Sequence, residues 1–458
     1  MITNNSTSAN HHASAAADQA ATAVSACIRR QIAGVDVADL AREYGTPLYA
    51  YDAEIIRRRC RDLAAWDTIR FAQKACSNLA VLNLIRQEGV VVDAVSTGEI
   101  HRALRAGYPA HTDRTATAVG LPAAITSALP SVHPIVYTAD IFDRVSLDAV
   151  ATLGIHVNCG SADMLEQLAE RVPGANVTLR VNPGFGHGHS QKTNTGGEGS
   201  KHGIWHEEIP EVLRRAEWAG LSVSGLHMHI GSGTDLVHLA EVAGALERVA
   251  IEIGRSLTMI SAGGGLPVPY KPDEVHADLG GYFELWNTTR KKLEDRFGHR
   301  IRLEIEPGRY LTAESGFVVT EVRAIKTQGA RKYLLVDAGF NTLARPVLYG
   351  SYHPMSLCPA DATAGITAGA EEVAVGGPLC ESGDIFTQTD GGFVASRSLP
   401  PAQVGDFLVI EIAGAYGFVM ASNYNSKPLP AEVLIDGGQA RLVRGRQTPE
   451  DLVRGESV

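Results

Sequence analysis

Residues that can carry chemistry stand directly after several short apolar runs of this sequence. Lys74 closes the run RFAQK, and His227 and His229 lie two residues apart near the end of LSVSGLHMHIG. Three consecutive glycines, 263–265, follow LTMISA, and the segment EPGR follows IRLEI. Taken singly, each has an ordinary structural explanation, because a glycine run is usually a turn and a lysine after a strand is usually a solvated surface residue. The two histidines are equally compatible with core packing or with a metal site.

Together these residue types match what a phosphorylated aldehyde cofactor with a pyridine ring requires. The Lys74 amine can condense with the aldehyde where its surroundings make it nucleophilic. Glu306 can hold a proton on the pyridine nitrogen, so that the ring withdraws electrons, and His229 offers a flat ring for stacking. The glycines let backbone N–H groups approach a phosphate, to which Arg309 adds a bidentate cation and Ser232 a hydroxyl. The sequence therefore indicates a pyridoxal-phosphate (PLP) site.

Short β-branched runs alternate with helical patterns between about residue 70 and residue 310. The predicted strands are 70–74, 90–96, 134–139, 154–161, 176–183, 221–231, 257–265 and 301–307. Each is nearly continuous in apolar content, as buried parallel strands are. Eight strands separated by helices favour an α/β fold with a (β/α)8 TIM-like barrel, and a doubly wound open sheet is the structural alternative. Reactive groups of such barrels lie at the C-terminal ends of the strands, where the chemistry-bearing residues stand.

The pattern changes after residue 310. The runs FVVTEVRAIK, KYLLVDAG, EEVAVGG, DFLVIEIAG and AEVLIDGGQARLVRG are typical of strands between turns, which predicts a C-terminal antiparallel β domain over 311–458. We expect the PLP-binding barrel over 35–310, with its first residues contributing to the β domain, and a disordered tail over 1–34. The polar segment 109–133 is expected to be a surface insertion, and the glycine-rich loop 186–203 is a candidate lid.

Composition limits the remaining classes of function. The 458 residues carry a formal charge of −10, so the chain lacks the basic character of a nucleic-acid-binding protein. The six cysteines show no CxxC spacing, which favours reduced thiols in a cytoplasmic protein. The sequence has no apolar stretch long enough to span a bilayer, and its first residues lack the basic start and leucine-rich core of a signal peptide. We therefore expect a cytoplasmic protein with a small-molecule substrate and neither a membrane nor a nucleic-acid partner.

Longer motifs link the chemistry-bearing residues in a fixed order. They are FAQKACSN, VDAVSTGEI, RVNPGFGHGHSQKTNTGG, SKHGIW, GLHMHIGSG, ISAGGGL, EIEPGRYL, VDAGFN, RPVLYGSYH, GPLCESGDIF and GAYGFVMASNYNSKPLPAEVL. In this order they resemble the fold-type III PLP-dependent decarboxylases, and most closely the diaminopimelate decarboxylase family. The resemblance runs from about residue 35 to the C-terminus. It implies PLP as the cofactor and a homodimer with shared active sites.

The resemblance implies a role for each matching residue. Lys74 would hold PLP as a Schiff base, and Cys380 would act in catalysis from the second subunit of the dimer. The residues implied to bind the cofactor are Lys74, His229, Ser232, Gly263, Gly264, Gly265, Glu306, Gly308, Arg309 and Tyr416. Those implied to bind the substrate are Arg309, Arg345, Tyr349, Glu381 and Tyr416. No residue is expected to bind a metal.

The activity implied by the resemblance is decarboxylation of meso-2,6-diaminopimelate at its D centre, which gives L-lysine and CO2 as the last step of lysine biosynthesis. Arg345 would recognise the carboxylate that stays on the product. Thr342 stands where the family pattern has aspartate, so a related PLP decarboxylase of another amino acid, as in siderophore assembly, is one alternative. A metal-dependent barrel hydrolase using His227 and His229 is a second alternative. A catalytically silent homologue that acts as a binding or regulatory protein is a third.

Overall fold

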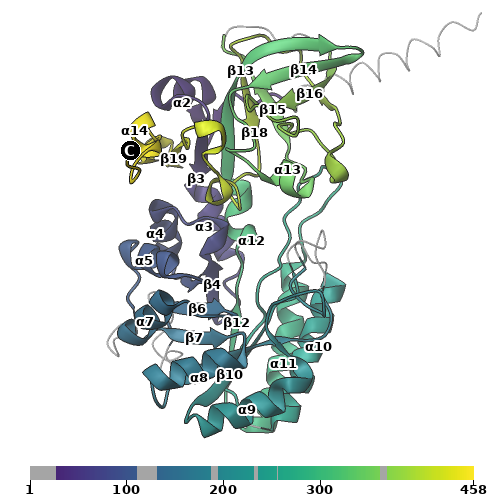
Figure 1. Cartoon of the computed structure of the whole chain (residues 1–458). Coiled ribbons are helices and arrows are strands. Elements are labelled where there is room, and N and C mark those ends of the chain that lie inside the picture. The colour runs from purple at the N-terminus through teal and green to yellow at the C-terminus, as the bar shows by residue number, and fades with distance from the viewer. Residues whose placement is uncertain (1–26, 111–131, 187–193, 232–235, 255, 362–368) are drawn as a thin grey trace, which may run out of the picture. The chain divides into compact units, whose positions relative to one another are not determined.

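The computed structural model describes residues 27–110, 132–186, 194–231, 236–254, 256–361 and 369–458 (Figure 1). The chain divides into two compact units. The barrel unit contains Glu54–Pro269 and Asp273–Ala313, and the sheet unit contains Met1–Ala53, Tyr270–Pro272 and Glu314–Val458. Most of the expected N-terminal tail, most of the expected insertion at 109–133 and residues 187–193 of the expected lid lie outside the described residues.

Within the described residues, eight parallel strands close into a barrel. In the order in which they neighbour one another they are β10 (Ser222–Met228), β11 (Met259–Ser261), β12 (Arg302–Ile305), β4 (Thr68–Ala72), β5 (Val91–Ala94), β6 (Ile135–Ala139), β7 (His156–Cys159) and β8 (Asn176–Asn182). β8 pairs with β10, from Asn176 opposite Ser222 to Val181 opposite Met228, and this pairing closes the ring. A short parallel strand, β9 (Ile204–Trp205), is added at the C-terminal end of β8. The barrel expected from the sequence is confirmed, and the open-sheet alternative is wrong.

Helices connect the barrel strands and surround them (Figure 1). They are α3 (Ala53–Arg61), α4 (Leu79–Gln87), α5 (Thr97–Arg105), α7 (Arg144–Leu153), α8 (Ala162–Arg171), α9 (Ile209–Trp218), α10 (Leu236–Ile253) and α11 (Leu279–Phe297), followed by the short α12 (Arg309–Thr312). Side chains before the first turn cap several of them, because Ser96, Asp143 and Ser161 accept hydrogen bonds from backbone N–H groups of α5, α7 and α8. Among the helices that the structure describes, none combines the length and apolar character needed to cross a membrane.

The barrel strands are apolar on one face only. In β12, Leu303 and Ile305 are fully buried, whereas Arg302 and Glu304 on the other face line a cavity inside the barrel. β8 follows the same alternation, with Thr178, Arg180 and Asn182 lining interior cavities. The strands are thus less uniformly apolar than buried parallel strands usually are, because the interior of this barrel holds charged and polar groups.

The sheet unit is built on a mixed sheet. Its main path runs β17 (Arg397–Leu399), β16 (Glu371–Gly376), β14 (Arg331–Val336), β13 (Gly316–Gln328), β3 (Leu48–Asp52), β19 (Ala431–Asp436) and β20 (Gln439–Arg444). β18 (Phe407–Ile410) pairs with β13 and with β15 (Met355–Cys358). Most pairs are antiparallel, but β14 with β16 and β3 with β19 are parallel. The separate β domain is confirmed, and its sheet is mixed where the sequence predicted an antiparallel one. Because β3 precedes the barrel in the chain, the sheet unit is assembled from both sides of the barrel sequence.

Short helices and a terminal hairpin complete the sheet unit. They are β1 (Gln31–Ile32), β2 (Val35–Asp36), α2 (Val37–Tyr44), α13 (Arg345–Tyr349) and α14 (Pro449–Leu452). The buried Val37 and Leu40 of α2 pack in one core cluster with Leu48, Val319 and Val433 of the sheet. The amphipathic α2 therefore covers one face of the central strands β13, β3 and β19.

Candidate active site

Lys74 lies in the 3-10 turn Gln73–Ala75, which follows β4. The surrounding backbone is fixed to both neighbouring strands. The Ala72 N–H donates to the carbonyl oxygen of Pro307 at 3.1 Å, and Gln73 Nε2 donates to that of Asp93 at 3.1 Å. The Lys74 side chain lines a cavity at the C-terminal end of the barrel together with His229 and Glu306. The sequence predicted that Lys74 is the last residue of the strand. In the structure Lys74 stands in the turn beyond the strand, and its side chain lines this cavity.

Glu306 follows β12 and is 5% exposed. Its Oε2 lies 3.1 Å from Nε2 of the buried His227. Burial alone would raise the pKa of Glu306, but the His227 imidazole and the Lys74 ammonium lower it to about 2. Glu306 is therefore ionised at neutral pH, which is the form that accepts a hydrogen bond from a protonated pyridine nitrogen. His227, for which the sequence offered a core or metal role, is the hydrogen-bond partner of this carboxylate.

A second buried carboxyl, Asp93 of β5, lies near both charges. Burial, followed by the negative charge of Glu306, raises the pKa of Asp93 well above its usual value, although the Lys74 ammonium acts in the opposite direction. Its Oδ1 has no hydrogen-bond partner within the described residues. As the pH falls, Asp93 takes up a proton before Glu306 does.

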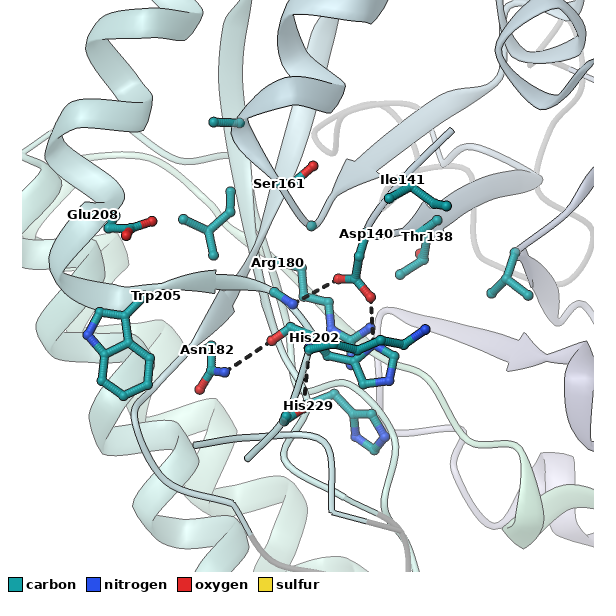
Figure 2. A pocket seen from close by; sticks show the side chains of 18 of the residues that line it. Thr138, Asp140, Ile141, Ser161, Arg180, Asn182, His202, Trp205, Glu208 and His229 are labelled. Atoms are coloured by element: carbon teal, nitrogen blue, oxygen red, sulfur yellow. Dashed lines mark hydrogen bonds and ion pairs between the residues drawn. The ribbon is translucent and has the colours of Figure 1, made fainter. Parts of the chain in front are cut away.

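His229 and Arg180 form another part of the cavity wall (Figure 2). Burial, followed by the positive charges of Arg180 and Lys74, lowers the pKa of His229 well below its usual value. The ring is therefore neutral at physiological pH. A neutral, flat imidazole can stack on a pyridine ring without adding a charge beside it.

The glycine turn after β11 is held tightly against its neighbours. The Glu306 N–H donates to the Gly263 carbonyl oxygen at 2.8 Å. Gly263 has a φ of +61°, and a Cβ there would lie 2.3 Å from the Met228 carbonyl oxygen. A Cβ on Gly264 would lie 2.6 Å from the Glu306 carbonyl oxygen and 3.6 Å from Cε1 of His229. Only glycine fits these two positions, and the turn passes directly beside the His229 ring.

The EPGR segment packs against the turn that carries Lys74. A Cβ on Gly308 would lie 3.2 Å from the Cβ of Ala75. Arg309 is buried at the start of α12, and Gly265 ends the glycine turn with a φ of +107°. Ser232, the expected phosphate-binding hydroxyl, lies outside the described residues. The structure thus gathers the glycine turn, the EPGR segment and Lys74 at one end of the barrel.

The cavity has a volume of about 1220 Å³, and hydrogen bonds to Asp140 reinforce its wall. Asp140, which follows β6, has its Oδ2 2.6 Å from His202 Nδ1, and its Oδ1 accepts the Gly203 N–H at 2.8 Å (Figure 2). Burial would raise the pKa of Asp140, but the His202 hydrogen bond and the Arg180 charge lower it overall. The carboxylate therefore ties residues 202–203, the end of the glycine-rich loop, to the barrel rim.

Several substrate-binding residues expected from the later motifs meet in the sheet unit. Arg345 is 6% exposed at the start of α13, and its Nη2 donates to Ser351 Oγ at 3.1 Å. Its Cζ lies 6.0 Å from the ring centroid of Tyr349, 5.9 Å from that of Tyr416 and 5.5 Å from that of Tyr270. The structure brings Arg345, Tyr349 and Tyr416 together. Tyr270 joins them although no sequence motif had singled it out.

Cys380 and Glu381 lie on an exposed turn of the sheet unit, after β16. The Cys380 N–H donates to Asn425 Oδ1 at 2.8 Å, and Glu381 Oε1 accepts the Gly383 N–H at 3.4 Å. Of the cysteines in the described chain, Cys380 is the exposed one. A thiol on the surface of its own unit is available to a substrate or to another chain.

Two cavity residues, Arg180 and Asp140, were not identified from the sequence. Arg180 stands two residues after Thr178 in β8, and Asp140 stands two residues after Thr138 of β6. Side chains two apart in a strand point to the same face, so this alternation would have placed both on the inner side of the barrel.

Comparison with known proteins assigns the family. A family model described as the pyridoxal binding domain of pyridoxal-dependent decarboxylases matches residues 53–313. The diaminopimelate decarboxylase of Escherichia coli (strain K12) is 52% identical over 416 residues, which cover 90% of this chain and 94% of that protein. The diaminopimelate decarboxylase of Streptomyces coelicolor is 50% identical over 423 residues, which cover 92% of each chain. The chain belongs to the pyridoxal-dependent decarboxylases.

Solved structures of decarboxylases have the same fold. A crystal structure of diaminopimelate decarboxylase that is 52% identical covers 91% of this chain and 95% of its own, with a TM-score of 0.84. The Helicobacter pylori diaminopimelate decarboxylase complexed with L-lysine is 28% identical, covers 91% and 98% of the two chains and has a TM-score of 0.77. Membership of the pyridoxal-dependent decarboxylases does not favour the alternative function of a metal-dependent barrel hydrolase.

The residues of this decarboxylase fit pyridoxal phosphate. An amine, an ionised carboxylate and a neutral imidazole surround one cavity, which is the set of groups that the aldehyde, the ring nitrogen and the ring face require. His229 Nδ1 and Asp93 Oδ1 are buried and lack a hydrogen-bond partner within the described residues, as expected of polar atoms that face a ligand. The cavity is also large enough for a cofactor together with an amino-acid substrate.

Proposed function

We propose that this decarboxylase acts on meso-2,6-diaminopimelate and removes the carboxylate at its D centre, which yields L-lysine and CO2. The observation that carries the proposal is the grouping of Lys74, Glu306 and His229 around one cavity. Diaminopimelate decarboxylases that match the chain over nine tenths of its length support this choice of substrate. When bound, pyridoxal phosphate supplies the electron sink for the electron pair that the departing CO2 leaves behind.

The residues of the barrel unit would bind and polarise the cofactor. The Lys74 amine would hold it covalently. Glu306, ionised because its pKa is lowered to about 2, would keep a proton on the ring nitrogen. His229 would stack on the ring with its neutral imidazole. The 263–265 backbone, Arg309, Gly308 and Ser232 would hold the phosphate.

The residues of the sheet unit choose the substrate. Arg345 recognises the carboxylate that stays on the product, and the Tyr349 and Tyr416 rings beside its guanidinium limit where that carboxylate can bind. Tyr416 would also contact the cofactor. A simple diamine precursor such as ornithine has no carboxylate at its distal end, so the substrate would offer no carboxylate to the Arg345 guanidinium. This contact therefore favours a substrate with a carboxylate at each end.

Reprotonation is the task of Cys380. Its Sγ donates a proton to the carbon atom that lost CO2, and Glu381 contacts the substrate from the same turn. Both residues come from the second subunit of a homodimer, so each active site is completed by the other chain. The enzyme works in the cytoplasm, as a reduced thiol in this role requires.

The first test is an assay of the PLP-loaded enzyme with meso-diaminopimelate and, separately, with ornithine, arginine and lysine. We expect L-lysine and CO2 from diaminopimelate and at least about a hundredfold lower kcat/KM for the others, because the Arg345 contact would be lost. The same machinery acting best on another amino acid would favour the related decarboxylase that Thr342 leaves as an alternative. Lys74→Ala serves as the control, because it should lose both turnover and the absorbance band that borohydride bleaches in the wild type.

A further inference from the structure

Glu306 and Thr138 border a second cavity, on the N-terminal side of the active-site cavity. This cavity, which we call the floor chamber, has a volume of about 120 Å³ and is lined by inward-facing side chains of the barrel, among them Asn158 and His227. Its lining extends to the N-terminal ends of the strands, where Asn176 is exposed. The floor chamber therefore lies between Glu306 and the end of the barrel opposite the substrate.

Two buried atoms on the chamber's lining residues lack a hydrogen-bond partner within the described part of the chain. They are Nδ1 of His227 and Oδ1 of Asn158, whose residues are 2% and 3% exposed. A buried polar atom without a partner costs free energy, and ordered water commonly satisfies such atoms in a polar cavity. A chamber of this volume has room for several water molecules, each of which occupies about 30 Å³ in the liquid.

The charged groups around the chamber are hydrogen-bonded to other protein groups. Glu304 binds both Arg70, with its Oε2 3.2 Å from Nη2, and Arg302, with its Oε1 2.9 Å from Nε. Arg70 also donates to the main-chain oxygens of Val92 and His133. Burial, followed by the charges of Arg70 and Arg302, lowers the pKa of His133 to about 4. Burial likewise lowers the pKa of His156, whose ring stacks on that of His133 with 4.4 Å between centroids.

Near neutral pH the His133 and His156 imidazoles are therefore neutral. Each nitrogen of the Arg70 guanidinium is hydrogen-bonded to protein, and Arg302 is paired with Glu304. None of these features requires a charged guest. Polar atoms in need of partners are satisfied by a small molecule that both donates and accepts hydrogen bonds, and water is such a molecule.

We propose that the floor chamber is filled with water and that His227, bonded to this water through Nδ1, positions the Glu306 carboxylate for the ring nitrogen of the cofactor. His227 Nε2 holds Oε2 of Glu306, which leaves Oε1 for the ring nitrogen. His227 is a positioning residue, because it acts on the cofactor through Glu306. The proposal rests on the cofactor of the family and is independent of which amino acid is decarboxylated.

Other titratable or charged groups also face Glu306 or His227. Lys74 of the turn after β4, Asp93 of β5 and His229 act on the ionisation of Glu306. Arg180 of β8 stands in register beside His227, and the uncharged Ser261 of β11 stands on its other side. A substitution at His227 leaves all these charges in place. Its effect on Glu306 therefore reports on the lost hydrogen bond and ring.

The test compares His227→Leu with His227→Gln in the PLP-loaded enzyme, through pH titration of the absorbance of the bound cofactor. The acid limb is the change in cofactor absorbance at low pH, where Glu306 takes up a proton. Leucine removes the donor to Glu306, so the pKa of Glu306 rises and the acid limb should move to higher pH by about one to two units. A shift of this size corresponds to the free energy of one hydrogen bond to a charged group. Glutamine can donate to Glu306 and accept from water, so it should return the limb to within about half a unit of the wild type. We also expect His227→Leu to lower kcat at least about tenfold while KM changes less than about threefold.

His156→Gln is the matched control, because His156 is a buried histidine of the same chamber whose Nε2 pairs with Thr178 Oγ1 at 2.9 Å and not with Glu306. It should lower thermal stability without moving the acid limb. Equal shifts in His156→Gln and His227→Leu, or no shift in His227→Leu, would overturn the positioning role. If His227→Leu does not fold, Asn158→Leu is the second variant. Its leucine side chain takes up space in the floor chamber and displaces water from it, so the acid limb should move in the same direction by a smaller amount.

A crystal structure of the loaded enzyme tests the water directly. We expect ordered water within hydrogen-bond distance of His227 Nδ1 and Asn158 Oδ1. A chamber that is dry, or that holds an anion between the guanidiniums, would overturn the proposal. Failure to release lysine from diaminopimelate would count against the proposed substrate and not against the chamber, because the cofactor spectrum is read without substrate.

Discussion

Asp93 and Glu306 are two buried carboxyls beside one ammonium group, that of Lys74. Burial raises the pKa of Asp93, whereas the His227 hydrogen bond and ring keep the pKa of Glu306 at about 2. The His227 imidazole, together with the Lys74 ammonium, thus separates two chemically similar side chains into an ionised partner for the cofactor ring and a carboxyl that is protonated more readily.

This order of protonation predicts that Asp93→Asn leaves the titration of Glu306 unchanged. Asp93 is already protonated at the pH where Glu306 takes up its proton, so the neutral amide removes no negative charge from beside Glu306 at that pH. The acid limb of the bound-cofactor titration should therefore stay within about half a unit of the wild type. A spectrophotometric titration of the loaded variant measures it. Movement of the limb by a full unit or more would show that Asp93 acts on Glu306 in some way other than through its charge.

Arg345 is the second residue whose type matters more than its charge. Arg345→Lys keeps the cation but loses the planar fork and the stacking against three tyrosine rings. We expect the KM for diaminopimelate to rise by about 10- to 100-fold, with the cofactor spectrum unchanged. Arg397→Lys is a matched control in the same unit, because the Arg397 guanidinium lies over Tyr352 at 4.2 Å. Equal losses in both variants would argue against substrate recognition by Arg345.

At the scale of elements, the inner face of the barrel is a polar layer instead of an apolar one. Glu304 of β12 is bridged to Arg70 of β4, its neighbour in the ring, and to Arg302 two residues earlier on its own strand. The stacked pair His133 and His156 lies at the edge of the same layer. Buried ion pairs of this kind contribute little net stability, but removal of one partner leaves an uncompensated charge. The stability of the barrel strands therefore depends on the protonation states of these buried groups.

This dependence predicts an acid-sensitive barrel. The pKa of His133 is about 4 in the folded protein against an ordinary 6.5, so the unfolded chain binds more protons between these values. The contribution of His133 to stability is fully present above pH 6.5 and is lost as the pH falls towards 4, by roughly 2 kcal/mol between pH 7.5 and pH 5. The urea midpoint should therefore fall less in His133→Gln than in the wild type over this range. His101→Gln, at an exposed position on α5, should keep the wild-type dependence, and an unchanged slope in His133→Gln would contradict the prediction.

At the scale of the whole molecule, the chemistry is divided between two units. The groups that suit the cofactor lie in the barrel unit, whereas Arg345, Tyr416 and Cys380 lie in the sheet unit. The proposed homodimer assigns Lys74 and Cys380 of one active site to different chains.

Mixing two inactive variants tests this arrangement. Lys74→Ala and Cys380→Ala homodimers should each be nearly inactive. After subunit exchange, half of the dimers are mixed and each carries one intact site, so about a quarter of the wild-type activity should return. Light scattering should give a particle of twice the 48.7 kDa chain mass. A dimer that regains no activity on mixing would place Lys74 and Cys380 of each site in the same chain.

The sequence by itself determined the barrel class, the family and the residues that suit a cofactor, because short apolar runs, their spacing and the order of motifs are properties of neighbouring residues. It did not place Lys74 correctly, because this residue stands in the turn beyond the end of β4. Such details depend on backbone dihedrals that residue types only bias.

The tertiary structure alone decided which polar groups meet. His227 and Glu306 are 79 positions apart, and Arg70 and Glu304 are 234 apart. Tyr270 reaches the Arg345 cluster from a segment between two barrel elements. These contacts follow from strand register and from closure of the ring, which sets β12 beside β4. Register is a property of the paired strands, so no local pattern could have shown that the first histidine of HMH is hydrogen-bonded to the carboxylate of EPGR.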